Sequence, residues 1–175
     1  MSSGIIVGIR TRPYMKDYIV SKYGLGSEPV RATTSNKVFP LLSQYLTHKP
    51  VNWRPPQAAE DIILFELPYN EVLNVRTRCY IHEDNFPEIT SFFYGMFYTH
   101  FINYMNSKCL DQKKIWRFKY AIYNFMDENS ISIDNINYDS LKRIYLRYRK
   151  QFENFNEREF DERSKKKQKK VNHFS

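Results

Sequence analysis

Glycine and cysteine are both scarce in this chain. Five glycines in 175 residues exclude collagen-like and low-complexity classes. The two cysteines, Cys79 and Cys109, are too few for a disulfide framework. With four histidines and no C-x-x-C pair, the sequence shows no metal-ligand spacing, and we expect no metal and no other cofactor.

Long apolar runs are missing as well. The densest stretch, residues 92–105, is interrupted by Gly95, Thr99, His100 and Asn103, and it falls short of the roughly 20 residues that span a bilayer. The first residues lack the basic segment of a signal peptide. These absences predict a soluble, intracellular (cytoplasmic) protein with free thiols and no membrane partner.

Common catalytic signatures are also absent, including glycine-rich phosphate loops, the serine nucleophile elbow and the zinc-protease motif. Glu66 lies in an apolar run, where desolvation would raise its pKa, but a solvent-facing position explains it better. His100 fits a hydrogen-bonded boundary histidine, and Cys79 a small buried residue. We therefore predict no enzyme, although a pocket joining His100, Glu66 and Cys109 would favour one.

Aromatic residues and positive charge are abundant instead. Phe, Tyr and Trp make up 17% of a chain that is otherwise globular in composition, and its length suits one domain with an appendage. The net charge of +8 is uneven: residues 1–109 carry 11 basic and 9 acidic side chains, whereas residues 110–175 carry 16 and 10. This distribution predicts an attraction for polyanions, unless the charge only maintains solubility.

The N-terminal part predicts a small antiparallel sheet. Residues 61–67 are apolar apart from Asp61 and Glu66 and predict a buried strand, and residues 72–81 alternate between polar and apolar, the period of a half-buried strand. We expect these strands to pair as a hairpin, with residues 5–10 as a third strand. The outward positions of the hairpin form a secondary patch of Arg76, Arg78 and Tyr80. A base of a single-stranded nucleic acid would stack on Tyr80 between the two arginines. The alternative is that these side chains are simply exposed on the surface.

Helical patterns occupy most of the remaining chain. Pro13 is suited to open a helix that stops at Gly24, and residues 38–46 predict a second, short helix. Aromatic residues recur at helical spacing from residue 86 to residue 110. Gly95 costs this long helix about 1 kcal/mol relative to alanine, and close packing of a neighbouring helix or strand is one reason to expect glycine there.

Two more amphipathic helices follow, over residues 112–129 and from a cap at Asn137 or Asp139 onward. On the polar side of the last helix, Arg143, Arg147 and Lys150 lie at i, i+4 and i+7. The full set of candidate nucleic-acid contacts adds neighbouring cations and the lysine tail: Lys113, Lys114, Arg117, Lys142, Arg143, Arg147, Arg149, Lys150, Lys165, Lys166 and Lys167.

Because a helix fits the DNA major groove, where arginine reads guanine and cations hold phosphates, this basic face predicts a DNA-binding protein, with DNA favoured over RNA. Residues 121–132 and 138–150, with the cadence F-M-D-E…Y-D-S-L-K-R-I-Y-L-R-Y-R, resemble the C-terminal helical module of small phage and mobile-element proteins. The resemblance implies an accessory or regulatory role. The alternative is a structural or assembly protein that docks an aromatic surface on a protein partner or on a second copy.

The expected fold class is α+β, mostly helical, with a small antiparallel β-sheet and a C-terminal helix–turn–helix-like unit. We expect an α+β domain over residues 1–110, a basic helix–turn–helix-like unit over residues 111–160 and a disordered basic tail over residues 161–175.

Overall fold

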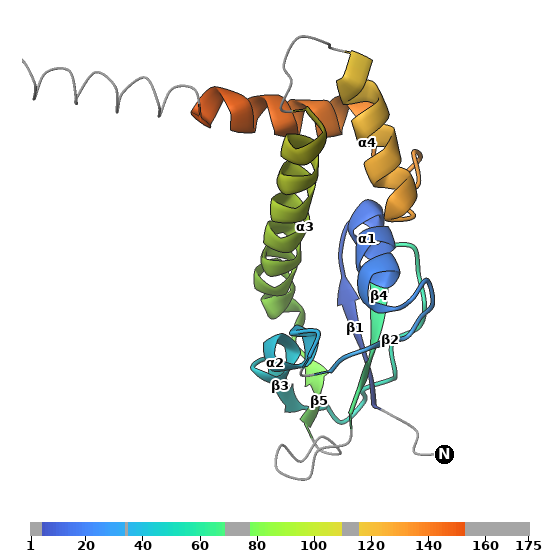
Figure 1. Cartoon of the computed structure of the whole chain (residues 1–175). Helices are drawn as coiled ribbons and strands as arrows, with labels where there is room; N and C mark the ends of the chain where they lie inside the picture. Colours follow the sequence, from blue (N-terminus) through green and yellow to red (C-terminus); the bar gives the residue numbers. More distant parts are fainter. Residues whose placement is uncertain (1–4, 34, 69–77, 110–115, 153–175) are drawn as a thin grey trace, which may run out of the picture.

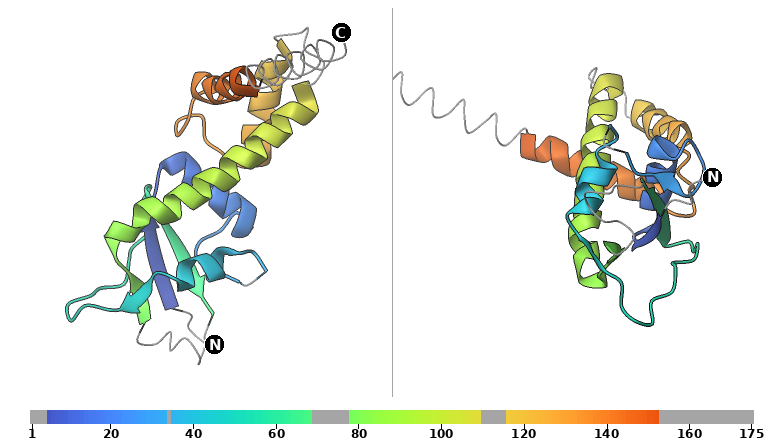
Figure 2. Two further views of the ribbon diagram at one scale, coloured as in Figure 1. Left: turned by 90° about the vertical axis from the view of Figure 1, so that its left-hand side faces the viewer. Right: turned by 90° about the horizontal axis from the view of Figure 1, so that it is seen from below.

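The computed structural model describes residues 5–33, 35–68, 78–109 and 116–152, with only the backbone of residues 116 and 117. Helix α3 (Phe86–Cys109) is the spine of the fold. Two small sheets lie toward its N-terminal end, and two C-terminal helices lie toward the other end (Figures 1 and 2). The fold is therefore mixed α and β, as the sequence predicts.

The first sheet consists of β1 (Ile5–Arg10), β4 (Ile62–Leu67) and β2 (Val30–Arg31), with β4 in the centre. β1 is antiparallel to β4, whereas β2 is parallel to it. Alternate side chains of the long strands are buried, and Phe65 stacks on Phe93 of α3 with ring centroids 5.8 Å apart. The sheet thus packs one face on the helices, as its period-two pattern requires.

The predicted hairpin between residues 61–67 and 72–81 is wrong for the described residues. Both edges of β4 are taken, by β1 and β2, and β5 (Arg78–Ile81) pairs instead with β3 (Leu46–His48) in a second sheet. The alternation did predict the buried side of β5, where Cys79 and Ile81 are 5% and 3% exposed. A period-two pattern fixes the buried face of a strand but not its neighbour.

The two N-terminal helices follow the sequence in part. Helix α1 (Pro13–Tyr23) begins and ends as predicted, and a Cβ at Gly24 would lie 2.4 Å from the Ser27 carbonyl oxygen. Helix α2 (Val38–Ser43) is shorter than predicted, because Leu46 leaves the helical pattern and pairs with Ile81 in the second sheet.

The aromatic stripe of α3 lies at the centre of the hydrophobic core. Phe93, Phe97 and Phe101 are fully buried. Phe97 meets Tyr18 of α1 edge-on at 5.2 Å and Phe125 at 5.9 Å. Replacing such a phenylalanine by alanine costs about 3–5 kcal/mol. Within the part of the chain that is described, no helix combines the length and apolar character needed to cross a bilayer.

Gly95 does not have the predicted close neighbour. It lies on the exposed side of α3, and a Cβ built on it meets no atom within 4 Å. The expectation of tight packing at this position is therefore wrong, and the fold gives no steric reason for glycine there.

The C-terminal helices pack on the far end of α3. Phe125 of α4 (Trp116–Glu128) contacts Phe101 at a centroid distance of 5.0 Å. After a turn, the helix of residues 138–152 starts with Asn137 as its cap, since the Asn137 Oδ1 accepts a hydrogen bond from the Ser140 amide at 2.9 Å. Tyr145 is 4% exposed and lies 5.5 Å from the Phe118 ring of α4.

Candidate nucleic-acid interface

A cleft of about 520 Å³ lies between the start of α1, the middle of α3 and the first half of the helix of residues 138–152. Arg12 precedes α1 and lines the cleft beside Tyr94 of α3. Arg143 and Arg147 line it from the C-terminal helix, one turn apart. Three arginines from two distant parts of the sequence thus line one cleft, which we call the arginine cleft.

Two hydrogen bonds, one half-buried and one exposed, tether the two sides of the arginine cleft. The Asp17 Oδ2 of α1 accepts hydrogen bonds from the Ser132 amide at 3.0 Å and from the Asn135 Nδ2 at 2.7 Å. The Ser132 Oγ in turn accepts the Asp134 amide at 3.2 Å. Because this turn leads directly into the capped helix, the tether sets where Arg143 lies relative to α1.

The arginine cleft is electropositive. Arg12, Arg143 and Arg147 are all exposed, and none of them forms an ion pair with another described residue. Asp134 is the carboxylate among the lining residues, so three cations face one anion. Burial raises the pKa of the Tyr14 hydroxyl, and the Arg12 guanidinium beside it opposes that rise. Such a cleft attracts phosphates and other anions.

A second hollow of about 490 Å³ continues the cleft toward the first sheet. It shares Arg12 and Tyr94 with the arginine cleft and adds Arg10 and Thr90. Arg10 forms an ion pair with Asp61 at 3.1 Å, but both side chains are about half exposed. An exposed pair of this kind is worth about 0–1 kcal/mol, so a bound polyanion would compete for Arg10 at little cost.

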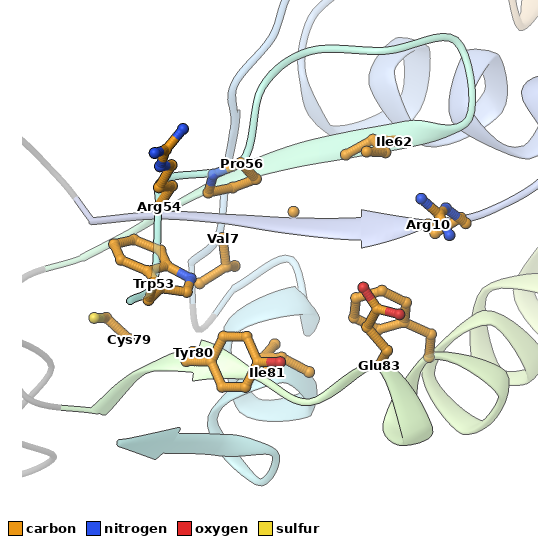
Figure 3. Close-up of a pocket in the computed structure, with 12 residues that line it drawn as sticks. Val7, Arg10, Trp53, Arg54, Pro56, Ile62, Cys79, Tyr80, Ile81 and Glu83 are labelled. Atoms are coloured by element: carbon orange, nitrogen blue, oxygen red, sulfur yellow. The ribbon is translucent and has the colours of Figure 1, made fainter. Parts of the chain in front are cut away.

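A third hollow, of about 260 Å³, lies on the other side of Arg10, between β1 and β5 (Figure 3). Trp53 and Arg54 line it from the proline-rich connector, and Tyr80 lines it from β5. Gly8 allows this connector to lie on β1, since a Cβ at Gly8 would be 2.6 Å from the Pro56 Cβ. Neighbouring hollows share lining residues, Arg10 between the third and the second and Arg12 between the second and the arginine cleft, and we call the row of three hollows the furrow. The furrow is lined by five arginines: Arg54, Arg10, Arg12, Arg143 and Arg147.

The structure divides the predicted cations of the last helix into two lines. Arg143 and Arg147 face the arginine cleft, and Lys150 is exposed one turn further on. Lys142 and Arg149 lie on another side: the Lys142 Nζ is 5.6 Å from the Tyr138 ring, and the Arg149 guanidinium is 6.0 Å from the Phe118 ring of α4. These two half-buried cations support packing rather than the cleft.

Other predicted contacts lie outside the described residues or apart from the cleft. Arg78 is exposed on β5, and Tyr80, two residues further along the same strand, is half-buried and lines the third hollow. The remaining predicted contacts fall outside the described residues or, for Arg117, have only a backbone: Lys113, Lys114, Arg117, Lys165, Lys166, Lys167 and Arg76.

Sequence reasoning missed Arg10, Arg12, Arg54 and Tyr94. Arg10 and Arg12 lie on either side of Thr11, at the junction between a strand and a helix that begins with proline. Neither the strand period of two nor the helical period of 3.6 residues applies at this junction. Their spacing of two at the end of an apolar strand was the available signal. Arg54 and Tyr94 gave no local signal, because tertiary packing alone brings them to the furrow.

The residues that would have favoured an enzyme have separate surroundings. The His100 Nδ1 lies 3.2 Å from the Tyr18 hydroxyl, which confirms a hydrogen-bonded boundary histidine, and burial lowers the His100 pKa with help from Lys22. Glu66 pairs with Arg31 at 3.2 Å on β2. Cys109 is buried at the end of α3, more than two turns from His100.

Comparison with models of protein families, with curated proteins and with solved structures finds no match for this chain. The furrow is therefore interpreted from its own chemistry.

Proposed function

We propose that this chain is a non-enzymatic nucleic-acid-binding protein, with DNA as its preferred ligand, and that the arginine cleft holds the phosphate backbone. The observation that carries the proposal is the convergence of Arg12, Arg143 and Arg147 on one cleft without ion-pair partners among the described residues. Three exposed guanidinium groups repel one another, and an anionic ligand relieves that repulsion.

Arginine is suited to this task. Its planar fork donates two parallel hydrogen bonds to a phosphate, and charge-assisted bonds of this kind are roughly twice as strong as neutral ones. The start of α1 adds to the positive field, because no acidic residue occupies its first turn and its amide dipoles point toward the cleft side. Phosphate contacts position a nucleic acid without reading its sequence.

The basic line along the C-terminal helix extends this interface. Lys150 continues the line of Arg143 and Arg147 one turn beyond the cleft. We propose that this helix and α4 act as a helix–turn–helix-like unit. The resemblance of residues 121–150 to phage and mobile-element modules supports an accessory or regulatory role of that kind.

Fluorescence anisotropy with labelled DNA, single-stranded and duplex, at two salt concentrations tests the proposal. Arg143→Ala and Arg147→Ala should each weaken binding, and Arg31→Ala is the matched control, because Arg31 is 82% exposed on the far edge of the first sheet. Absence of binding to either DNA by the unmodified chain at low salt would overturn the proposal.

One observation favours the alternative of a protein-docking surface. Phe92 and Tyr94 of α3 are 42% and 39% exposed, and a hollow of about 770 Å³ that includes Phe92 and Met96 opens over Gly95. Light scattering across a range of concentrations separates the two functions. A stable oligomer that is indifferent to nucleic acid, and that Phe92→Ser dissociates, would favour docking over DNA binding.

A further inference from the structure

We infer that the hollow between β1 and β5 receives an unpaired base of the bound strand, so that the ligand of the furrow is single-stranded. This inference rests on the proposed function and specifies its ligand. In Figure 3 the rings of Trp53 and Tyr80 lie near one end of the hollow, Arg54 stands above that end, and Arg10 and Glu83 stand at the other.

The chemistry of the lining matches a nucleobase. A base presents a flat π-face and an edge of hydrogen-bond donors and acceptors, and unpaired bases stack on aromatic side chains. Trp53 and Tyr80 supply aromatic surface, and Val7 adds an apolar wall. The Arg10 guanidinium, whose Nε is paired with Asp61, has further N–H donors for a base edge, and the Glu83 carboxylate is an acceptor, so both kinds of base edge find a partner.

The size of the hollow favours one base. Its volume of about 260 Å³ lies just below the roughly 300–1,000 Å³ of pockets for drug-sized ligands. A single planar ring system fits this scale, but a base within a duplex is stacked and paired, and it enters such a hollow only after it leaves the helix. In an unpaired strand, a base enters the hollow without this cost of leaving a base pair.

The base hollow is linked to the arginine cleft by shared lining residues. Arg10 lines both the base hollow and the second hollow, and Arg12 lines both the second hollow and the arginine cleft. From Val7 to Arg10, within β1, the chain advances about 10 Å at ~3.3 Å per residue. A strand whose base enters the hollow therefore continues past Arg10 toward Arg12.

Tryptophan fluorescence tests the inference, because Trp53 and Trp116 are the two tryptophans of the chain. In the full-length protein carrying Trp116→Phe, Trp53 is the remaining tryptophan, so the tryptophan emission comes from Trp53. An oligothymidylate of about 10 nucleotides, within the 4–16 nucleotides of known single-strand sites, should quench this emission at saturation. The matching duplex should leave it unchanged.

Affinity measurements with variants complete the test. Trp53→Ala and Tyr80→Ala should each weaken single-strand binding by roughly 5- to 150-fold, the equivalent of about 1–3 kcal/mol per stacked base, and leave duplex binding unchanged. Trp53→Phe and Tyr80→Phe keep a ring and should stay within a few-fold of the unmodified chain. Phe92→Ala is the control, because it removes an exposed aromatic ring outside the furrow.

The outcomes separate the inference from the proposed function. If the unmodified chain binds no nucleic acid, the proposed function fails and the inference fails with it. If Arg143→Ala weakens binding while Trp53→Ala and Tyr80→Ala do not, and Trp53 emission is unaffected, the function stands and the base hollow is refuted. An equal loss of single-strand and duplex affinity in Trp53→Ala also refutes it, since that result indicates a general structural defect.

Discussion

The carboxylate of Asp17 accepts a hydrogen bond from the backbone amide of Ser132 at 3.0 Å, which joins α1 to a turn 115 residues later in the chain. The same oxygen accepts the Asn135 side-chain amide at 2.7 Å. This contact holds the start of the C-terminal helix against the N-terminal part of the fold. It therefore couples the position of Arg143 to that of Arg12.

Removing the tether should weaken both folding and binding. Asp17→Ala leaves the Ser132 amide without its carboxylate, and a hydrogen bond to a charged group contributes about 1.5–3 kcal/mol. We expect the free energy of unfolding in urea to fall by about that amount. Binding to single-stranded DNA should weaken as well, because the two sides of the arginine cleft separate.

The direction in which Asp17→Ala changes the affinity for DNA tests whether Asp17 positions the cleft. Asp17→Ala makes the chain more positive, and net charge alone would strengthen binding to DNA. Stronger binding by this variant would contradict the role of Asp17 in positioning the cleft.

The cleft carboxylate should oppose binding. Asp134→Asn removes the anion that faces the three arginines and keeps the backbone hydrogen bond to the Ser132 Oγ. Anisotropy titrations should show several-fold tighter binding at low salt, and the gain should shrink as salt screens the charges. Asp127→Asn, an exposed position on α4, is the control of equal charge change. An equal gain in both variants would show that only net charge matters.

Replacement by alanine should change stability in opposite directions at Gly95 and at Gly8. Gly95→Ala should raise the free energy of unfolding by about 1 kcal/mol, because the helix gains propensity and the new methyl group meets nothing within 4 Å. Gly8→Ala should lower it, because the new Cβ collides with Pro56 at 2.6 Å. Urea unfolding measures both. Destabilisation by Gly95→Ala would indicate a contact that the exposed face of α3 does not show.

His100 should make stability depend on pH. Its pKa in the folded chain is lowered from 6.5 by burial first and by Lys22 second, with Glu128 opposing. The unfolded chain therefore binds more protons below pH 6.5, so stability is fully present above that value and is lost as pH falls toward the lowered pKa. His100→Gln should flatten the change in melting temperature between about pH 7 and about pH 5. An unchanged profile would assign the pH dependence to other groups.

Local patterns predicted the elements of this fold better than their arrangement. The strand Ile5–Arg10 and the helices that begin at Pro13 and Phe86 follow from periodicity, proline and caps. The partner of β5 did not, because Leu46 reads as part of a helix until its pairing with Ile81 is known.

For the candidate site, too, local patterns predicted residues better than their arrangement. Helical spacing identified Arg143 and Arg147, since they recur on one polar side. It gave no reason to place them opposite Arg12, because the arginine cleft arises from the packing of α1, α3 and the C-terminal helix. Spacing also grouped Lys142 with them, although Lys142 lies over the Tyr138 ring.

The most direct test of the account is the salt dependence of DNA binding by Arg12→Ala, because a basic C-terminal helix acting alone would not need this residue. Each phosphate contact contributes a slope of about −0.7 for single strands or −0.9 for duplex in log K against log salt. We predict that Arg12→Ala weakens binding and flattens the slope by about one contact, as Arg143→Ala does. Affinity and slope equal to those of the unmodified chain would contradict a phosphate-binding cleft built jointly by Arg12 and the C-terminal helix.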